Sequence, residues 1–208
     1  MINDTPYSLN HPYQGASLLG LPFAPSMQAL VLAWDIDTIC QAWLECIRAL
    51  PLAVLLTPTP SRTRSIRNLA INVFVPVSLL ERAWSQGSFP WPGNPLLHLS
   101  GEQHLAEYES TIEAANPSRD TLVRFSEQIK LSWSVFIEDH GKEFASFSPV
   151  VTTPRGELQY ERLLESQRLH AAQHFRQVTS FLLTAGYEVP TPFRAEALKG
   201  LDLPATIF

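Results

Sequence analysis

Apolar residues recur at intervals of three and four along four long segments of this chain, and this spacing most constrains its fold. Such spacing places the apolar side chains along one side of an α-helix, where a neighbouring helix has to cover them. The segments run over residues 35–50, 61–86, 118–141 and 157–185. The first one carries a complete stripe, formed by Ile36, Ile39, Cys40, Trp43, Ile47 and Leu50.

Prolines and glycines mark the ends of these segments, and the chain contains 17 prolines in 208 residues. Pro51 ends the first helix, Ser118 fits the start of the third, and Gly186 fits the end of the fourth. Pro76 falls inside the second segment and predicts a kink, because proline has no backbone N–H to donate. A shorter helix at about residues 101–115 is also indicated.

This pattern predicts an all-α protein with an up-down four-helix bundle over residues 35–186. Residues 1–34 contain several turn signals together with apolar residues, so we expect an irregular arm that packs on the bundle. Residues 187–208 are expected to form an irregular C-terminal tail. No segment has the alternating pattern of a convincing set of strands.

Charge and apolar run length exclude several classes of partner. The net charge of −5, from 15 basic and 20 acidic residues, leaves no basic surplus for a nucleic-acid backbone. The longest apolar runs, at residues 29–34 and 51–56, fall far short of the roughly 20 residues that span a membrane. Cys40 and Cys46 lie six apart on one predicted helix and cannot pair. We therefore expect a cytoplasmic protein without nucleic-acid or membrane partners.

His170 and His174 lie four residues apart on the last predicted helix, so both rings leave the same face. Two imidazoles at this spacing can chelate one divalent cation if another helix supplies a third ligand. The same face also carries Leu163, Gln167, Gln177 and Phe181. It is therefore apolar at both ends and polar in its middle. Two interpretations stay open: a metal site, or a hydrogen-bonded polar layer that only fixes the register of the helices.

The motif His170-x3-His174-x-Arg176-Gln177, late on the last helix and followed by Gly186, resembles the DinB/YfiT-like superfamily. The nearest resemblance is to the DinB-type domains that occur with glutaredoxin-like partners. The resemblance implies a DinB/YfiT-like four-helix bundle, often a homodimer, with a divalent metal ion bound by three histidines. It also implies hydrolase activity or thiol-dependent transferase or isomerase activity on an unknown small molecule.

Asn72 stands where the resemblance places the first histidine ligand, on the second helix. An amide oxygen binds zinc or nickel more weakly than imidazole does. The candidate metal ligands are thus His170, His174 and Asn72, and Gln177 and Arg176 are the candidate cofactor-binding residues. The alternative is a non-catalytic small-molecule-binding or protein-interaction module that has lost the metal site.

Two charged residues of the helices are interpreted without a function. Asp35 or Asp37 fits the N-terminal turn of the first helix, where a carboxylate meets free backbone amides. Arg168 is expected on a solvated face or in an ion pair with Glu161 or Glu165 on its own helix.

Overall fold

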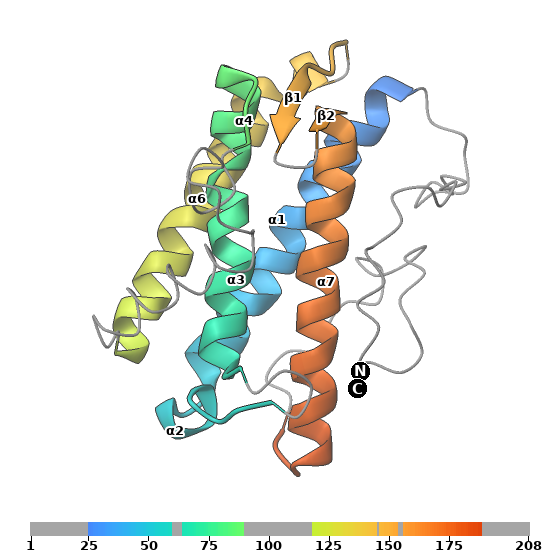
Figure 1. Ribbon diagram of the computed structural model, residues 1–208. Coiled ribbons are helices and arrows are strands. Elements are labelled where there is room, and N and C mark those ends of the chain that lie inside the picture. The colour runs from blue at the N-terminus through green and yellow to red at the C-terminus, as the bar shows by residue number, and fades with distance from the viewer. Residues whose placement is uncertain (1–24, 60–63, 90–117, 145, 154–155, 189–208) are drawn as a thin grey trace, which may run out of the picture.

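The computed structural model describes residues 25–59, 64–89, 118–144, 146–153 and 156–188 (Figure 1). Long helices lie side by side in it, and one small sheet packs near one end. Residues 1–24 of the predicted arm, residues 189–208 of the predicted tail and the predicted helix at 101–115 lie outside these residues. The elements are α1 (Pro25–Ala49), α2 (Leu52–Leu55), α3 (Ile66–Ser78), α4 (Leu80–Gln86), α6 (Arg119–Phe144), β1 (Val150–Thr153), β2 (Gly156–Gln159) and α7 (Tyr160–Thr184).

The first helix begins at Pro25, so the prediction of an irregular arm is wrong for residues 25–34. Proline is well suited to the first helical position, where a backbone N–H would have no partner within the helix. Ala29, Leu32 and Ala33 are buried and extend the apolar stripe toward the N-terminus. Pro25, one of the turn signals in the predicted arm, therefore marks the start of a helix.

The second predicted helix, expected as one helix with a kink, is two helices, α3 and α4, with an interruption at Leu79. The N–H of Leu79 donates to the carbonyls of Pro76 and Val77, which closes α3 before α4 begins. Pro76 has no N–H for the carbonyl of Asn72, one turn earlier in α3. The interruption thus follows from the proline, as the sequence predicts.

Ser65 caps the N-terminus of α3, and we expect this cap to contribute measurably to stability. Its Oγ accepts a hydrogen bond from the backbone N–H of Asn68 at 3.2 Å. Replacing Ser65 with Ala should lower the free energy of unfolding by about 1 kcal/mol, as measured by urea denaturation. The exposed Ser85 of α4 is the matched control, and its replacement by Ala should change stability by less than about 0.5 kcal/mol. Equal unfolding midpoints for the two variants would contradict the cap.

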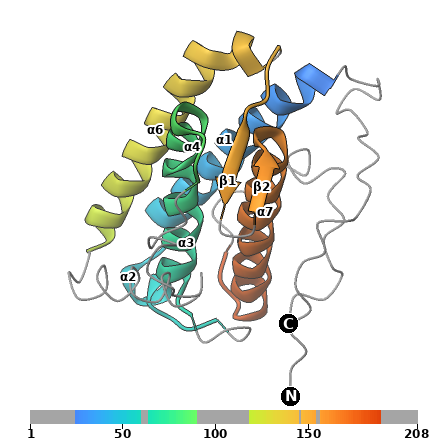
Figure 2. The same cartoon turned by 45° about the horizontal axis from the view of Figure 1, so that its top comes forward.

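Contacts between helices establish the direction of each one (Figures 1 and 2). α1 and α7 run in parallel, because an ion pair joins Asp35 to Arg168 and a hydrogen bond joins Trp43 to Ala171 further along both. α1 and α6 run antiparallel, since the start of α1 meets the end of α6. The contacts that show this join Ala33 to Trp133 and Arg48 to Glu127.

The helix α4 runs in the same direction as α6, so the predicted up-down alternation is wrong here. Ser132 donates a hydrogen bond to Glu81 at 3.3 Å, and Trp84 packs edge-on against Phe144, further along both helices. Both pictures show α3 and α4 ascending together with α6 (Figures 1 and 2). Apolar periodicity sets which face of a helix is buried, but it carries no information on the direction of its neighbours.

A two-stranded antiparallel sheet makes the protein mostly, but not purely, helical. β1 and β2 pair with Val151 opposite Leu158, and Val151 is fully buried. The hairpin is tied to the end of α4, because Thr152 exchanges backbone hydrogen bonds with Gly87 and Phe89. The prediction of an all-α chain is wrong at this point, because strands of four residues are too short to show a clear alternation.

The core gathers around α1, which packs on both α6 and α7. Trp43 is fully buried, and its indole N–H lies 3.3 Å from the carbonyl oxygen of Ala171. Its ring meets Phe175 in a T-shaped contact, with ring centroids 5.5 Å apart. These contacts fix the middle of α7 against α1. Of the helices in the described parts of the chain, none is long and apolar enough to cross a membrane.

A candidate metal site between α3 and α7

The face of α7 that carries the paired histidines is directed into the protein, as the sequence predicts. Leu163, Gln167, His174 and Gln177 are buried, and His170 is partly exposed. α3 runs antiparallel to this helix and brings Asn72 to His174, while Leu80 of α4 meets Tyr160. The polar middle of the predicted stripe therefore forms one cluster between α3 and α7.

His174 is the centre of this cluster and contacts three polar side chains. Its Nδ1 lies 2.7 Å from Oε1 of Gln177, and its Nε2 lies 3.1 Å from Nε2 of His170. The same Nε2 lies 3.2 Å from Nδ2 of Asn72. The four side chains His170, His174, Gln177 and Asn72 are called the polar cluster below.

The donors and acceptors of the polar cluster follow from its chemistry. Oε1 of Gln177 can only accept, so Nδ1 of His174 carries the hydrogen and donates it. Nε2 of His174 then has a lone pair, which accepts from the Asn72 amide group and from the Nε2–H of His170. Gln177 thereby fixes one tautomer of His174 and directs its lone pair toward Asn72 and His170.

Two distances in the polar cluster are close to the spacing of nitrogen ligands on one metal ion. Nitrogen ligands at about 2.0–2.1 Å from a tetrahedral zinc ion lie about 3.3 Å from each other. The Nε2 atoms of His170 and His174 are 3.1 Å apart, and Asn72 Nδ2 is 3.2 Å from the latter. Oδ1 of Asn72 is buried and has no hydrogen-bond partner among the described residues. A half-turn of this amide would direct its oxygen toward Nε2 of His174.

The donor set is weaker than a typical metal centre. Among the described residues, no three His, Cys, Asp or Glu side chains come together in a group that could hold a metal ion. The polar cluster offers two imidazoles and one amide, so Asn72 would have to be the third donor. Arg176, the other candidate cofactor-binding residue, is partly exposed on α7 and contributes none of the three contacts to His174.

A buried ion pair joins α1 to α7 beside the polar cluster, and the sequence interpretation missed it. Nε of Arg168 lies 2.7 Å from Oδ2 of Asp35, and the two residues are only 3% and 6% exposed. Burial raises the pKa of Asp35 to about 6, although the guanidinium of Arg168 opposes this increase. Asp35 is therefore not at a helix start, and Arg168 is not on a solvated face.

The sequence contains a signal for this ion pair. Arg168 follows Leu164 by four residues and precedes Ala171 by three, so it lies on a buried face of α7. Asp35 likewise follows Leu32 by three and lies within the stripe of α1. Two opposite charges on two buried stripes predict a buried pair once the helices are known to pack together.

Neither cysteine is a candidate nucleophile. Cys40 and Cys46 are both buried in the core between the helices. Burial raises the pKa of the Cys40 thiol strongly and that of the Cys46 thiol to about 12. Both thiols therefore stay protonated at neutral pH, which makes them unreactive.

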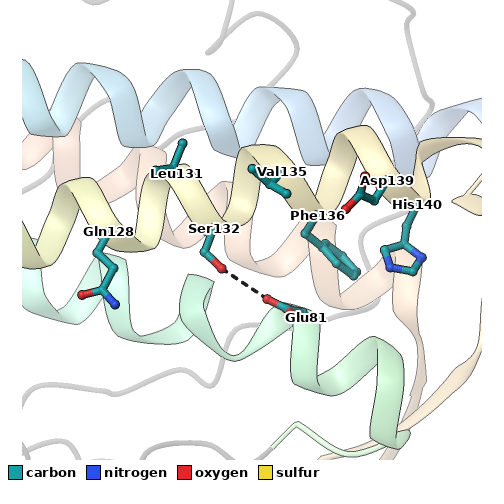
Figure 3. A pocket seen from close by; sticks show the side chains of 8 residues that line it. All are labelled: Glu81, Gln128, Leu131, Ser132, Val135, Phe136, Asp139 and His140. Carbon is teal, nitrogen blue, oxygen red and sulfur yellow. Dashed lines mark hydrogen bonds between the residues drawn. The ribbon is translucent and has the colours of Figure 1, made fainter.

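A shallow hollow of about 340 Å³ lies elsewhere, between α4 and α6 (Figure 3). Ser132 and Glu81 meet across it, and the side chains of Leu131 and Val135 are exposed beside them. None of its lining residues belongs to the polar cluster. The lining residues are Glu81, Gln128, Leu131, Ser132, Val135, Phe136, Asp139 and His140.

Comparison with known proteins leaves the function to be argued from this geometry. The DinB/YfiT-like resemblance stays a prediction. No protein-family model, no curated protein and no solved structure matches the chain.

Proposed function

We propose that the polar cluster binds a divalent metal ion, zinc or nickel, through His170, His174 and Asn72. The protein would then be a DinB-like metal-dependent enzyme, a hydrolase or a thiol-dependent transferase or isomerase, on a DinB/YfiT-like four-helix bundle. The observation that supports this most is the 3.1 Å approach of the two imidazole Nε2 atoms. Imidazole nitrogens are common ligands of zinc, and two of them lie this close together in many metal sites.

Each residue of the polar cluster has a defined part in this proposal. Gln177 holds the Nδ1–H of His174, and a partner on the second ring nitrogen orients a histidine ligand. His170 needs its hydrogen on Nδ1 to present an Nε2 lone pair, which is a change of tautomer. Asn72 turns its amide group so that Oδ1 replaces Nδ2.

The exposure of these residues indicates where a substrate approaches. Asn72 and His174 are only 3% and 5% exposed, whereas His170 is partly exposed. A substrate therefore reaches the site past His170, and the other two residues exclude water from the inner side. A divalent ion held there supplies Lewis acidity, which polarises a carbonyl group or lowers the pKa of a water or thiol.

One observation favours the second candidate, a non-catalytic small-molecule-binding or protein-interaction module. Nδ2 of Asn72 donates to Nε2 of His174 at 3.2 Å, so the polar cluster satisfies this nitrogen without any metal. A chain that had lost its metal site would keep such a layer to fix the register of α3 and α7.

A homodimer and a cytoplasmic location stay predictions. Light scattering on the purified protein tests whether it is a homodimer.

Elemental analysis of protein purified without an affinity tag distinguishes the two functions. We expect one equivalent of zinc or nickel in the wild-type protein and almost none after His174→Ala, because the variant removes the central ligand. Gln177→Ala should weaken metal affinity by about 10- to 100-fold, since His174 loses its orienting partner. Unfolding midpoints show whether each variant still folds.

His140→Ala is the matched control for this experiment. His140 is a partly exposed histidine of α6 that pairs with Glu143 at 3.0 Å, outside the polar cluster. This variant should keep its metal. Metal-free wild-type protein that stays metal-free after incubation with zinc or nickel would contradict the enzyme and support the binding module.

A further inference from the structure

We infer that the hollow between α4 and α6 is a docking surface for a basic amphipathic helix of a partner protein. None of the residues that line it in the described parts of the chain belongs to the polar cluster. The inference therefore goes beyond the metal function proposed above and does not depend on it. Its basis is the exposed apolar surface, the charge and the length of the hollow (Figure 3).

Two large apolar side chains of α6 are exposed at the hollow. Leu131 is 65% exposed and Val135 is 46% exposed, and the two lie one turn apart on the helix. Phe136 lines the hollow beside them and is buried, so the apolar surface continues into the core. Exposed apolar surface with a polar rim is typical of sites that bind another protein.

The polar rim of the hollow carries negative charge. Glu81 of α4 accepts a hydrogen bond from Ser132 of α6 at 3.3 Å, which directs its carboxylate across the hollow (Figure 3). Asp139 adds a second, exposed carboxylate two turns further along α6. Lysine and arginine are absent from the described lining residues. Residues 90–117, which lie between α4 and α6 in the sequence, contain four glutamates and no lysine or arginine, so they supply no positive charge.

The length and depth of the hollow suit a helix. Its lining residues on α6 extend from Gln128 to His140, which is about 18 Å along the helix axis, or three helical turns. A shallow hollow leaves most of a small molecule exposed, whereas a docked helix needs cover on one face only. The apolar face of such a helix would contact Leu131 and Val135, and its lysines or arginines would meet the two carboxylates.

Fluorescence anisotropy with a synthetic peptide tests this inference. The probe is a fluorescein-labelled peptide of about 15 residues, or four helical turns, with leucine at intervals of three and four and lysine on the other face. Its acidic twin carries glutamate in place of each lysine. We expect the wild-type protein to bind the lysine peptide at least about tenfold more tightly than the acidic twin, because only lysine complements the carboxylates. Added salt should weaken this binding.

Leu131 is the apolar anchor of the proposed docking surface. Leu131→Asn should weaken binding of the lysine peptide by at least about fivefold, because it removes the most exposed apolar side chain of the hollow. Leu183→Asn is the matched control. Leu183 is 63% exposed on α7, outside the hollow, and its replacement should leave the affinity unchanged.

The acidic rim has its own pair of variants. Glu81→Gln/Asp139→Asn removes both carboxylates of the hollow and should weaken binding of the lysine peptide by about three- to tenfold. Glu157→Gln/Glu188→Gln removes two exposed carboxylates outside the hollow. This control should change the affinity by less than about twofold, since exposed charges at a distance are screened by salt.

The outcomes decide what the hollow binds. Equal affinity of the wild-type protein and both hollow variants for the lysine peptide overturns the inference, because the peptide then binds elsewhere. The absence of any anisotropy change with the wild-type protein overturns it as well. Light scattering tests the other occupant: a wild-type dimer that becomes monomeric after Leu131→Asn but not after Leu183→Asn would place a second copy of the chain in the hollow, against the inference. Bound metal should be the same in the Leu131→Asn variant and the wild-type protein, so the metal function is judged separately.

Discussion

At pH 8, replacing Arg168 with Met should lower the free energy of unfolding by about 3–5 kcal/mol. The variant leaves the Asp35 carboxylate buried without the guanidinium that lies 2.7 Å from it. A lone buried charge costs far more than an exposed one, because the surrounding apolar groups cannot replace its water. Urea denaturation of the two proteins at pH 8 measures the difference.

The size of this effect should depend on pH. The pKa of Asp35 rises from 3.8 to about 6 on folding, so the folded protein binds this proton more tightly than the unfolded chain does. Protonation of Asp35 therefore stabilises the folded state fully below pH 3.8, and this contribution is lost as pH rises through 6. Arg168 lowers this pKa, and its removal moves the pKa further upward. At pH 5 Asp35 is mostly protonated in both folded proteins, and the variant should lose much less stability than at pH 8.

Two further variants keep this expectation testable. Arg162 is an exposed arginine of the same helix that pairs with Glu165, and Arg162→Met should cost less than about 1 kcal/mol. The double variant Asp35→Leu/Arg168→Met removes both charges and should recover most of the lost stability. A loss at pH 5 as large as that at pH 8 would show that the ion pair has no part in it.

Replacing Trp43 with Ala should cost about 3–5 kcal/mol, the range for a large aromatic side chain in a core. Trp43 is fully buried between α1 and α7, against Phe175 and the carbonyl of Ala171. The same contacts hold the part of α7 that carries His174. The variant should therefore also weaken metal binding, which titration of the folded protein at low temperature measures.

Trp34 provides the control on the same helix. It is 41% exposed, so Trp34→Ala should change the free energy of unfolding by less than about 1 kcal/mol. Trp43→Phe keeps most of the ring packing and removes only the indole N–H, which should cost about 1 kcal/mol. Similar losses for the alanine variants at residues 34 and 43 would contradict the packing of Trp43 described above.

The features that the sequence predicts correctly are those that neighbouring residues determine. Ser118 caps α6 by accepting a hydrogen bond from the N–H of Thr121, and Gly186 ends α7 with a φ of 78°. The break after Pro76 depends on one missing N–H. The start of α1 was missed because Pro25 suits both a turn and a first helical position, and only the buried residues after it distinguish them.

The candidate site was predictable in part. The spacing of His170, His174 and Gln177 places them on one face, and the structure shows their contacts. Asn72 was assigned through the resemblance, and a contact between residues 102 positions apart has no local signal. The direction of α6 and the pair of Asp35 with Arg168 were missed for the same reason, because both depend on how distant helices pack.

The parallel pairing of α1 with α7 also has a consequence for how the protein folds. Trp43 and Ala171 are 128 residues apart, so the inner face of α1 gains this cover only after most of the chain has been made. Contacts between such distant residues slow folding, because a large loop must close before they form. On the ribosome, the part of α1 that α7 covers would stay exposed until α7 emerges, and exposed apolar surface of this kind favours aggregation.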